Sequence, residues 1–136
     1  YPDKEGNFNE IISYDKSYYL PHAGMNISFS VKKLKKNELI PKNNYTKWFD
    51  CDKIYNVISI RNQKPEDYFV FNTSGNTKKL DDYYKNNKIK RDVRKTIPLI
   101  TDGNHVMWIL GHRTSEAYRV TENTERVLEV SVRFEE

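Results

Sequence analysis

The residues best suited to chemistry lie in one short basic stretch, residues 88–95, with the sequence KIKRDVRK. This stretch holds five Lys or Arg side chains and a single Asp. Lys binds phosphate as a point charge, and the planar Arg guanidinium binds it through paired N–H groups. With helical spacing, the cations would lie on a different side from Ile89 and Val93. Two interpretations stay open, an anion site and a solvated helix face.

The charge of the whole chain is concentrated around this stretch. The formal net charge is +4, but residues 61–95 carry ten basic and five acidic side chains, whereas residues 96–136 carry four and seven. Net charge argues about partners rather than about fold. A basic segment followed by an acidic one favours a localised anion site over a uniformly basic surface.

Catalytic and metal-binding motifs are missing from the sequence. His22, His105 and His112 are scattered, with no Cys or carboxylate at the spacing of metal ligands. The chain has no GxxxxGK[ST], no GxGxxG and no serine elbow. We therefore expect no catalytic residue and no metal ligand in this chain.

The elements that must position the cations form an α+β arrangement. Leu80, Tyr83, Tyr84 and Asn87 have the spacing of an amphipathic helix, for which Thr77 is the expected N-cap. A second short helical segment over 88–95 must end near residue 96, because Pro98 excludes the preceding residue from the α region. The turn NTSGNT, residues 72–77, is expected to lead into the first helix and to offer free backbone N–H groups to phosphate.

Strands account for most of the remaining apolar residues. Apolar and polar residues alternate over 26–31, 57–61 and 126–132, and two apolar runs flank the turn residues DGN at 102–104 as in a hairpin. Residues 32–45 and 64–77 are expected to form loops. The predicted fold class is α+β, mostly antiparallel β-structure with one or two short helices.

Length and composition set the wider limits. The 136 residues suit one domain, and no apolar run approaches the roughly 18 residues of a membrane helix. The single Cys fits a reducing compartment, so we expect a cytoplasmic protein without membrane partners. The chain starts with Tyr1 rather than Met, which suggests a part of a longer protein.

Several motifs follow one another in a fixed order within residues 48–130: KPEDYF (64–69), KKLDD (78–82), KIKR (88–91), IPL (97–99) and DGNHVMWILGHRTSEAYRVT (102–121). In this order they resemble the C-terminal domain of bacterial tRNA(Ile)-lysidine synthetase. The chain departs from the family pattern at Glu66, Tyr68, Lys90, Thr114 and the pair Lys95–Thr96. Phosphate contacts that the family makes at the positions of Tyr68 and Thr96 are therefore not carried over.

The resemblance implies a function. The whole enzyme would use ATP to join lysine to the wobble cytidine of an isoleucine tRNA, as a ligase of tRNA modification. This chain would hold the tRNA on its acceptor-stem side, and ATP and Mg would bind only in a catalytic N-terminal domain. That domain and isoleucine tRNA would be its partners, with a homodimer as a further possibility. Whether the chain alone is an enzyme is left open.

We predict residues 1–47 to be an N-terminal β/loop segment and residues 48–136 to be the domain core. The predicted RNA contacts are the cations of the basic region with three supporting residues: Lys78, Lys79, Lys85, Lys88, Lys90, Arg91, Arg94 and Lys95, supported by Arg61, Lys64 and Arg113. Lys78 and Lys79 have an alternative role over the core, and Arg113 has one as a partner of Glu116. The alternative function is a structural docking or dimerisation module without RNA contact, and a general RNA-binding domain is a further alternative.

Overall fold

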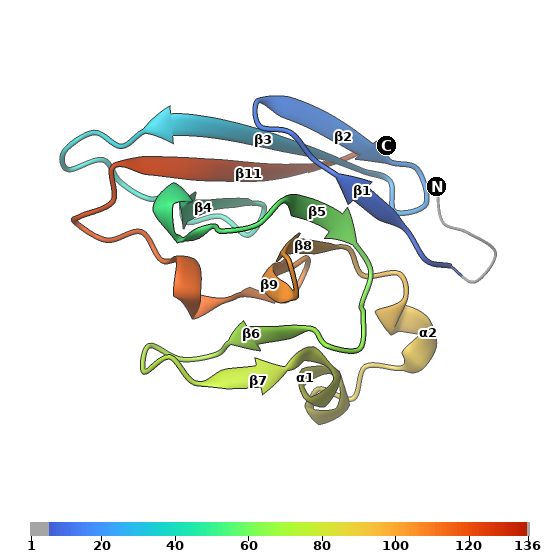
Figure 1. The fold of residues 1–136 in the computed structure, drawn as a ribbon. Coiled ribbons are helices and arrows are strands. Elements are labelled where there is room, and N and C mark those ends of the chain that lie inside the picture. The colour runs from blue at the N-terminus through green and yellow to red at the C-terminus, as the bar shows by residue number, and fades with distance from the viewer. Residues whose placement is uncertain (1–5, 136) are drawn as a thin grey trace. The chain divides into compact units, whose positions relative to one another are not determined.

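A computed structural model describes residues 6–135 (Figure 1). Within this range the chain forms two compact units, which we describe separately. Unit 1 contains residues 12–55 and 118–135, and unit 2 contains residues 6–11 and 56–117. The chain therefore passes between the two units three times. The predicted boundary between residues 47 and 48 stays a prediction.

Unit 1 is built on a four-stranded antiparallel sheet of order β2-β3-β11-β4. The strands are β2 (Lys16–Leu20), β3 (Met25–Lys33), β4 (Thr46–Asp50) and β11 (Arg126–Phe134). Ile27 and Phe29 of β3 are fully buried, as are Leu128 and Val130 of β11, which lie two residues apart in the same way. The alternation read from the sequence thus places one face of these two strands in the core. A 3₁₀ turn, η1 (Cys51–Lys53), follows β4.

Unit 2 is built on a seven-stranded sheet whose main path is β1-β5-β8-β9-β6-β7, with β10 paired to β9. The strands are β1 (Asn9–Ile11), β5 (Ile58–Arg61), β6 (Tyr68–Val70), β7 (Thr77–Lys79), β8 (Leu99–Asp102), β9 (His105–Ile109) and β10 (Arg113–Thr114). All pairings are antiparallel except that of β6 with β9. A second 3₁₀ turn, η2 (Glu116–Tyr118), follows β10.

The predicted hairpin at residues 102–104 joins β8 to β9. Gly103 lies there at a φ of 63°, which L side chains rarely adopt, and a Cβ at this position would lie 3.1 Å from Nδ2 of Asn56. The turn residues in the sequence therefore predicted this connection correctly.

Two short helices complete unit 2: α1 (Leu80–Asn86) and α2 (Arg91–Arg94). Leu80 and Tyr84 are four residues apart on one face of α1, and both are fully buried in a cluster with apolar residues of the sheet: Phe69, Ile97, Leu99, Val106 and Ile109. Asp81 and Asp82 occupy the first turn, where carboxylates suit the helix dipole. Both predicted helices are thus confirmed.

Three local predictions are wrong. Thr77 is not the N-cap of α1, because it begins strand β7, and Lys79 takes the cap position without a side-chain hydrogen bond. The turn at residues 72–76 joins β6 to β7 and is separated from the helix by that strand, so its N–H groups are not at a helix N-terminus. The segment 64–77 is not all loop, because Tyr68–Val70 forms β6, and strand β4 was not predicted.

Candidate anion-binding site

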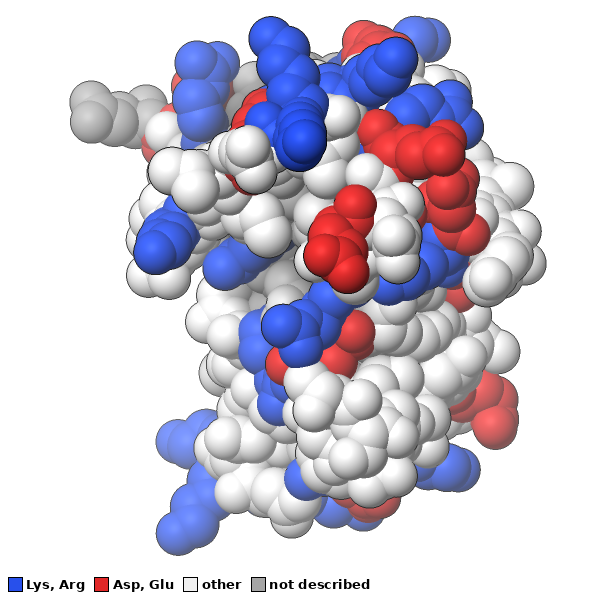
Figure 2. Space-filling view, turned by 90° about the vertical axis from the view of Figure 1, so that its left-hand side faces the viewer, with Lys and Arg blue, Asp and Glu red and all other residues white. Residues whose placement is uncertain are grey.

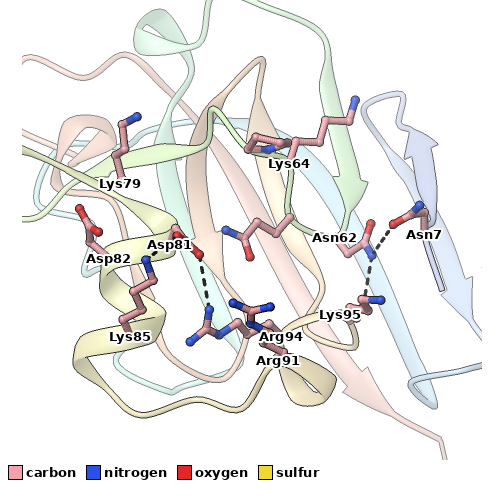
Figure 3. A pocket seen from close by; sticks show the side chains of 12 residues that line it. Asn7, Asn62, Lys64, Lys79, Asp81, Asp82, Lys85, Arg91, Arg94 and Lys95 are labelled. Atoms are coloured by element: carbon pink, nitrogen blue, oxygen red, sulfur yellow. Dashed lines mark hydrogen bonds and ion pairs between the residues drawn. The ribbon is translucent and has the colours of Figure 1, made fainter. Parts of the chain in front are cut away.

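An open pocket of about 500 Å³ lies in unit 2 (Figure 3). Six of its lining residues are cationic and two are acidic. We call it the basic pocket, and its lining residues are Asn7, Asn62, Gln63, Lys64, Pro65, Lys79, Asp81, Asp82, Lys85, Arg91, Arg94 and Lys95. These come from the segment just before β1, from the loop after β5, from the end of β7, from α1, and from α2 with the residue that follows it.

The loop that follows β5 is held in place by a buried ion pair. Arg61 donates from Nη1 to Oδ2 of Asp67 at 2.8 Å and from Nη2 to Oδ1 at 2.7 Å, and the two side chains are 3% and 0% exposed. Arg61 also donates to the carbonyls of Asn62 and Gly103. Asp67 accepts in addition from the backbone N–H of Lys64 at 2.8 Å. The pair thus fixes both ends of the loop that carries one wall of the pocket.

A second set of bonds ties this loop to the rest of the pocket. Asn62 is 5% exposed and its Nδ2 donates to the carbonyl oxygen of Gly6 at 3.1 Å and to that of Lys95 at 3.4 Å. Its Oδ1 accepts from the backbone N–H of Phe8 at 3.4 Å. One buried amide therefore links three chain segments that are distant in sequence, which places Asn7 and Lys95 at the same opening.

The opposite wall is organised around Asp81 (Figure 3). Its Oδ2 lies 3.2 Å from Nζ of Lys85, and its Oδ1 accepts from Nη1 of Arg94 at 3.4 Å. The hydrogen bond with Lys85 lowers the pKa of Asp81 below its ordinary value, and the charge of Arg94 acts in the same direction. The carboxylate therefore stays ionised and holds one cation on each oxygen.

Arg94 is the most constrained cation of the basic pocket. Besides Asp81, its Nε donates to the carbonyl oxygen of Ile89 at 2.7 Å, and its guanidinium lies 5.6 Å from the ring centroid of Tyr84. Its side chain is 14% exposed, whereas that of Lys85 is 61% exposed. The partly buried guanidinium is thus held by a carboxylate, a carbonyl and an aromatic ring.

The structure brings six of the eleven predicted contact residues together and leaves five outside. The six that line the basic pocket are Lys64, Lys79, Lys85, Arg91, Arg94 and Lys95. Arg61 was predicted to contact RNA but is not available for such a contact, because its buried guanidinium is already bonded to Asp67 and to two carbonyls. Lys78 and Arg113 lie over the rings of Phe71 and Phe69, at 5.1 and 5.0 Å from the centroids.

The last two residues outside the pocket, Lys88 and Lys90, are exposed. Lys88 follows α1 at a φ of 56°, and Lys90 is the N-cap of α2. Sequence reasoning missed the neutral residues Asn7, Asn62 and Gln63; Asn7 reaches the cations only through the tertiary fold, whereas Asn62 and Gln63 directly precede Lys64. The pairing of Asp81 with Lys85 was readable from their i, i+4 spacing.

The geometry suits binding rather than catalysis. Six cations against two carboxylates in a concave site attract a polyanion, and guanidinium and amide groups can donate to phosphate oxygens.

Among residues 6–135, no group of three or more His, Cys, Asp or Glu side chains is placed to hold a metal ion. The face on the left of Figure 1, viewed in Figure 2, carries interspersed basic and acidic side chains, so positive charge there is not segregated. No helix in the described part is long and apolar enough to cross a membrane.

Two mostly antiparallel sheets with two short helices define the chain as an α+β domain, and the fold class predicted from the sequence is confirmed. The family described as the TilS substrate C-terminal domain matches residues 58–132, more than half of the chain, and the chain belongs to this family. A crystal structure titled as that of the TILS C-terminal domain has the same fold, with a TM-score of 0.74 over 94% of this chain and 97% of that chain, at 19% identity.

The relatives found by sequence are named tRNA(Ile)-lysidine synthase. The protein of Clostridium perfringens (strain 13 / Type A) is 37% identical over 111 residues, which is 82% of this chain and 24% of the relative. The protein of Clostridium acetobutylicum is 38% identical over 94 residues, 69% of this chain and 20% of the relative. The chain thus spans about a quarter or less of the length of these bacterial relatives, and the resemblance seen in the sequence is confirmed.

Proposed function

We propose that this chain is the tRNA-holding C-terminal part of a tRNA(Ile)-lysidine synthase. The observation that carries the proposal is the basic pocket, where six cations from three chain segments face one opening with only two carboxylates. Membership of the TilS substrate C-terminal domain family and the names of the relatives support the same role.

The pocket would bind the sugar–phosphate backbone of the tRNA on its acceptor-stem side. The major groove of an A-form stem is too deep and narrow for side chains to read, so such a stem is recognised by backbone and shape. Lys and Arg side chains that contact phosphates fix the position of an RNA without reading its sequence. The chain would then supply orientation and affinity rather than chemistry.

The partners of the proposal are isoleucine tRNA and a catalytic N-terminal domain of the same protein. ATP, Mg and lysine would be bound by that domain, which joins lysine to the wobble cytidine. The cytoplasm as location and the homodimer remain predictions of the sequence.

The test is binding of a labelled isoleucine tRNA transcript to the 136-residue chain, followed by fluorescence anisotropy over a series of salt concentrations. Neutralising about four phosphates gives a slope of log K against log salt of roughly −3 to −4. A fourfold rise in salt should therefore weaken binding by about 60-fold to 250-fold. A flat salt response would contradict the proposed phosphate contacts.

A pair of charge-reversal variants locates the site. Arg91→Glu with Lys95→Glu reverses two exposed cations of the basic pocket, and Lys33→Glu with Lys36→Glu makes the same change of net charge in unit 1. We expect the first variant to lose at least tenfold more affinity than the second, about 1.4 kcal/mol. Equal losses would point to an overall charge effect. Absent RNA binding together with a dimer in sedimentation would favour the docking alternative.

A further inference from the structure

The six cations of the basic pocket are not equivalent, and one carboxylate makes the difference. Asp81 contacts both Lys85 and Arg94, one on each oxygen. Asp82, the other carboxylate of the pocket, has no ion pair among the described residues. The two neighbouring acids therefore contribute the same charge to the pocket but have different contacts.

The contacts of Arg94 leave part of its guanidinium for a ligand. Nε is used by the carbonyl oxygen of Ile89, and Nη1 contacts Asp81. Nη2 makes no hydrogen bond to any described residue, and Arg94 lines the pocket. A guanidinium fixed on one edge presents its remaining N–H groups in a set direction, and little rotamer freedom is then lost when a phosphate binds.

We infer that Asp81 is a positioning residue, which holds Arg94 and Lys85 in place so that the pocket binds a phosphate of the RNA backbone through a preset pair of cations. This inference rests on the proposed function, because it concerns the same site. The carboxylate of Asp81 then increases the affinity of the pocket for RNA, although its negative charge alone would decrease that affinity.

The opposite signs of these two effects allow a direct test. Asp81→Asn and Asp82→Asn each remove one negative charge from the same pocket. If only charge matters, both variants bind the isoleucine tRNA transcript about twofold tighter, as expected for one exposed charge. If Asp81 positions the two cations, Asp81→Asn binds about threefold to tenfold more weakly, since two side chains must be ordered on binding.

The control for a merely structural effect is a double-mutant cycle. Arg94→Ala removes the main side chain that Asp81 positions, and the further change Asp81→Asn should then cost less than it does in the wild-type background. Asp81→Glu keeps a carboxylate at this position of the helix, so it should lose less affinity than Asp81→Asn does. Unfolding midpoints within about 2 °C of the wild type show that the fold is unchanged, since about 1 kcal/mol moves the midpoint by several degrees.

The outcomes separate the inference from the proposed function. If Arg94→Ala weakens binding but Asp81→Asn matches Asp82→Asn, the positioning role is wrong and the RNA site stands. If the wild-type chain shows no salt-dependent binding of the transcript at all, the proposed function fails and the inference fails with it.

Discussion

Two regions of the molecule gather lysines, and only one of them has the composition of an anion site. The basic pocket of unit 2 has six cations and two carboxylates. A groove in unit 1 has a larger volume, about 920 Å³, and contains three Lys and three Glu. We call it the mixed-charge groove; its charged residues are Lys33, Lys35, Lys36, Glu38, Glu122 and Glu125. The number of cations is therefore a weaker signal than the acids that accompany them.

The two regions also differ in how their charges are held. The loop of the basic pocket is anchored by Arg61 and Asp67, which are almost fully buried. In the mixed-charge groove, the ion pair of Glu38 with Lys32 at 2.8 Å has side chains that are 24% and 38% exposed. A buried, bidentate pair fixes a backbone segment, whereas a partly exposed pair adds little to the free energy of unfolding.

The largest expected effect comes from removing the buried ion pair that anchors the loop of the basic pocket. Asp67→Asn leaves the charge of Arg61 buried without its counter-ion, so the free energy of unfolding should fall by about 3–5 kcal/mol. Urea denaturation measures this loss. The double variant Arg61→Met with Asp67→Leu should recover most of it, and a double variant as unstable as the single one would show that the ion pair is not the cause.

A smaller effect is expected from Tyr84, which lies on the buried face of α1. The hydroxyl of Tyr84 is buried without a hydrogen-bond partner among the described residues, and burial raises its pKa. Tyr84→Phe removes this unsatisfied group and keeps the ring that faces Arg94. We expect unit 2 to gain about 1 kcal/mol of stability, with the affinity for tRNA unchanged. Loss of stability in thermal unfolding would indicate that the hydroxyl has a partner after all.

The mixed-charge groove can be made more like the basic pocket by removing acidic side chains from it. Glu122→Gln with Glu125→Gln leaves the three Lys of the mixed-charge groove without two of its three acids. Affinity for the tRNA transcript should rise by only about threefold, because exposed charges on a surface are well screened. The gain should be equal for a DNA duplex of the same length, measured by anisotropy. A gain confined to tRNA would instead make the groove a specific RNA site.

The smallest effect concerns pH and a histidine of unit 2. His105 of unit 2 is half-buried, contacts the hydroxyl of Ser115 at 2.8 Å, and has a pKa lowered by burial. Its neutral form is favoured by folding, so this stability is complete above the ordinary pKa of about 6.5 and declines as pH falls below it. Unfolding midpoints at pH 7.5 and 5.5 measure the decline. His105→Gln does not titrate and should show a smaller difference, and an identical difference would contradict this role.

Much of the fold was predictable from local patterns, and the pocket was predictable only in part. Gly103 and its neighbours identified the hairpin, and the spacing of Leu80 and Tyr84 identified α1, because these signals lie within a few residues. Strand β6 has only three residues, too few for an alternation to be recognised. Asn7 meets the cations through tertiary packing, which leaves no periodic signal in the sequence. Arg61 was assigned to the ligand because a sequence does not show that Asp67 neutralises it.

The order in which segments of the chain belong to the two units determines what a truncation removes. Residues 12–55 and 118–135 make one unit, and the segments before and between them make the other. A stop codon near residue 118 would spare every lining residue of the basic pocket but delete β11, the strand between β3 and β4. Because segments of the two units alternate along the chain, no single truncation removes one unit whole and leaves the other complete.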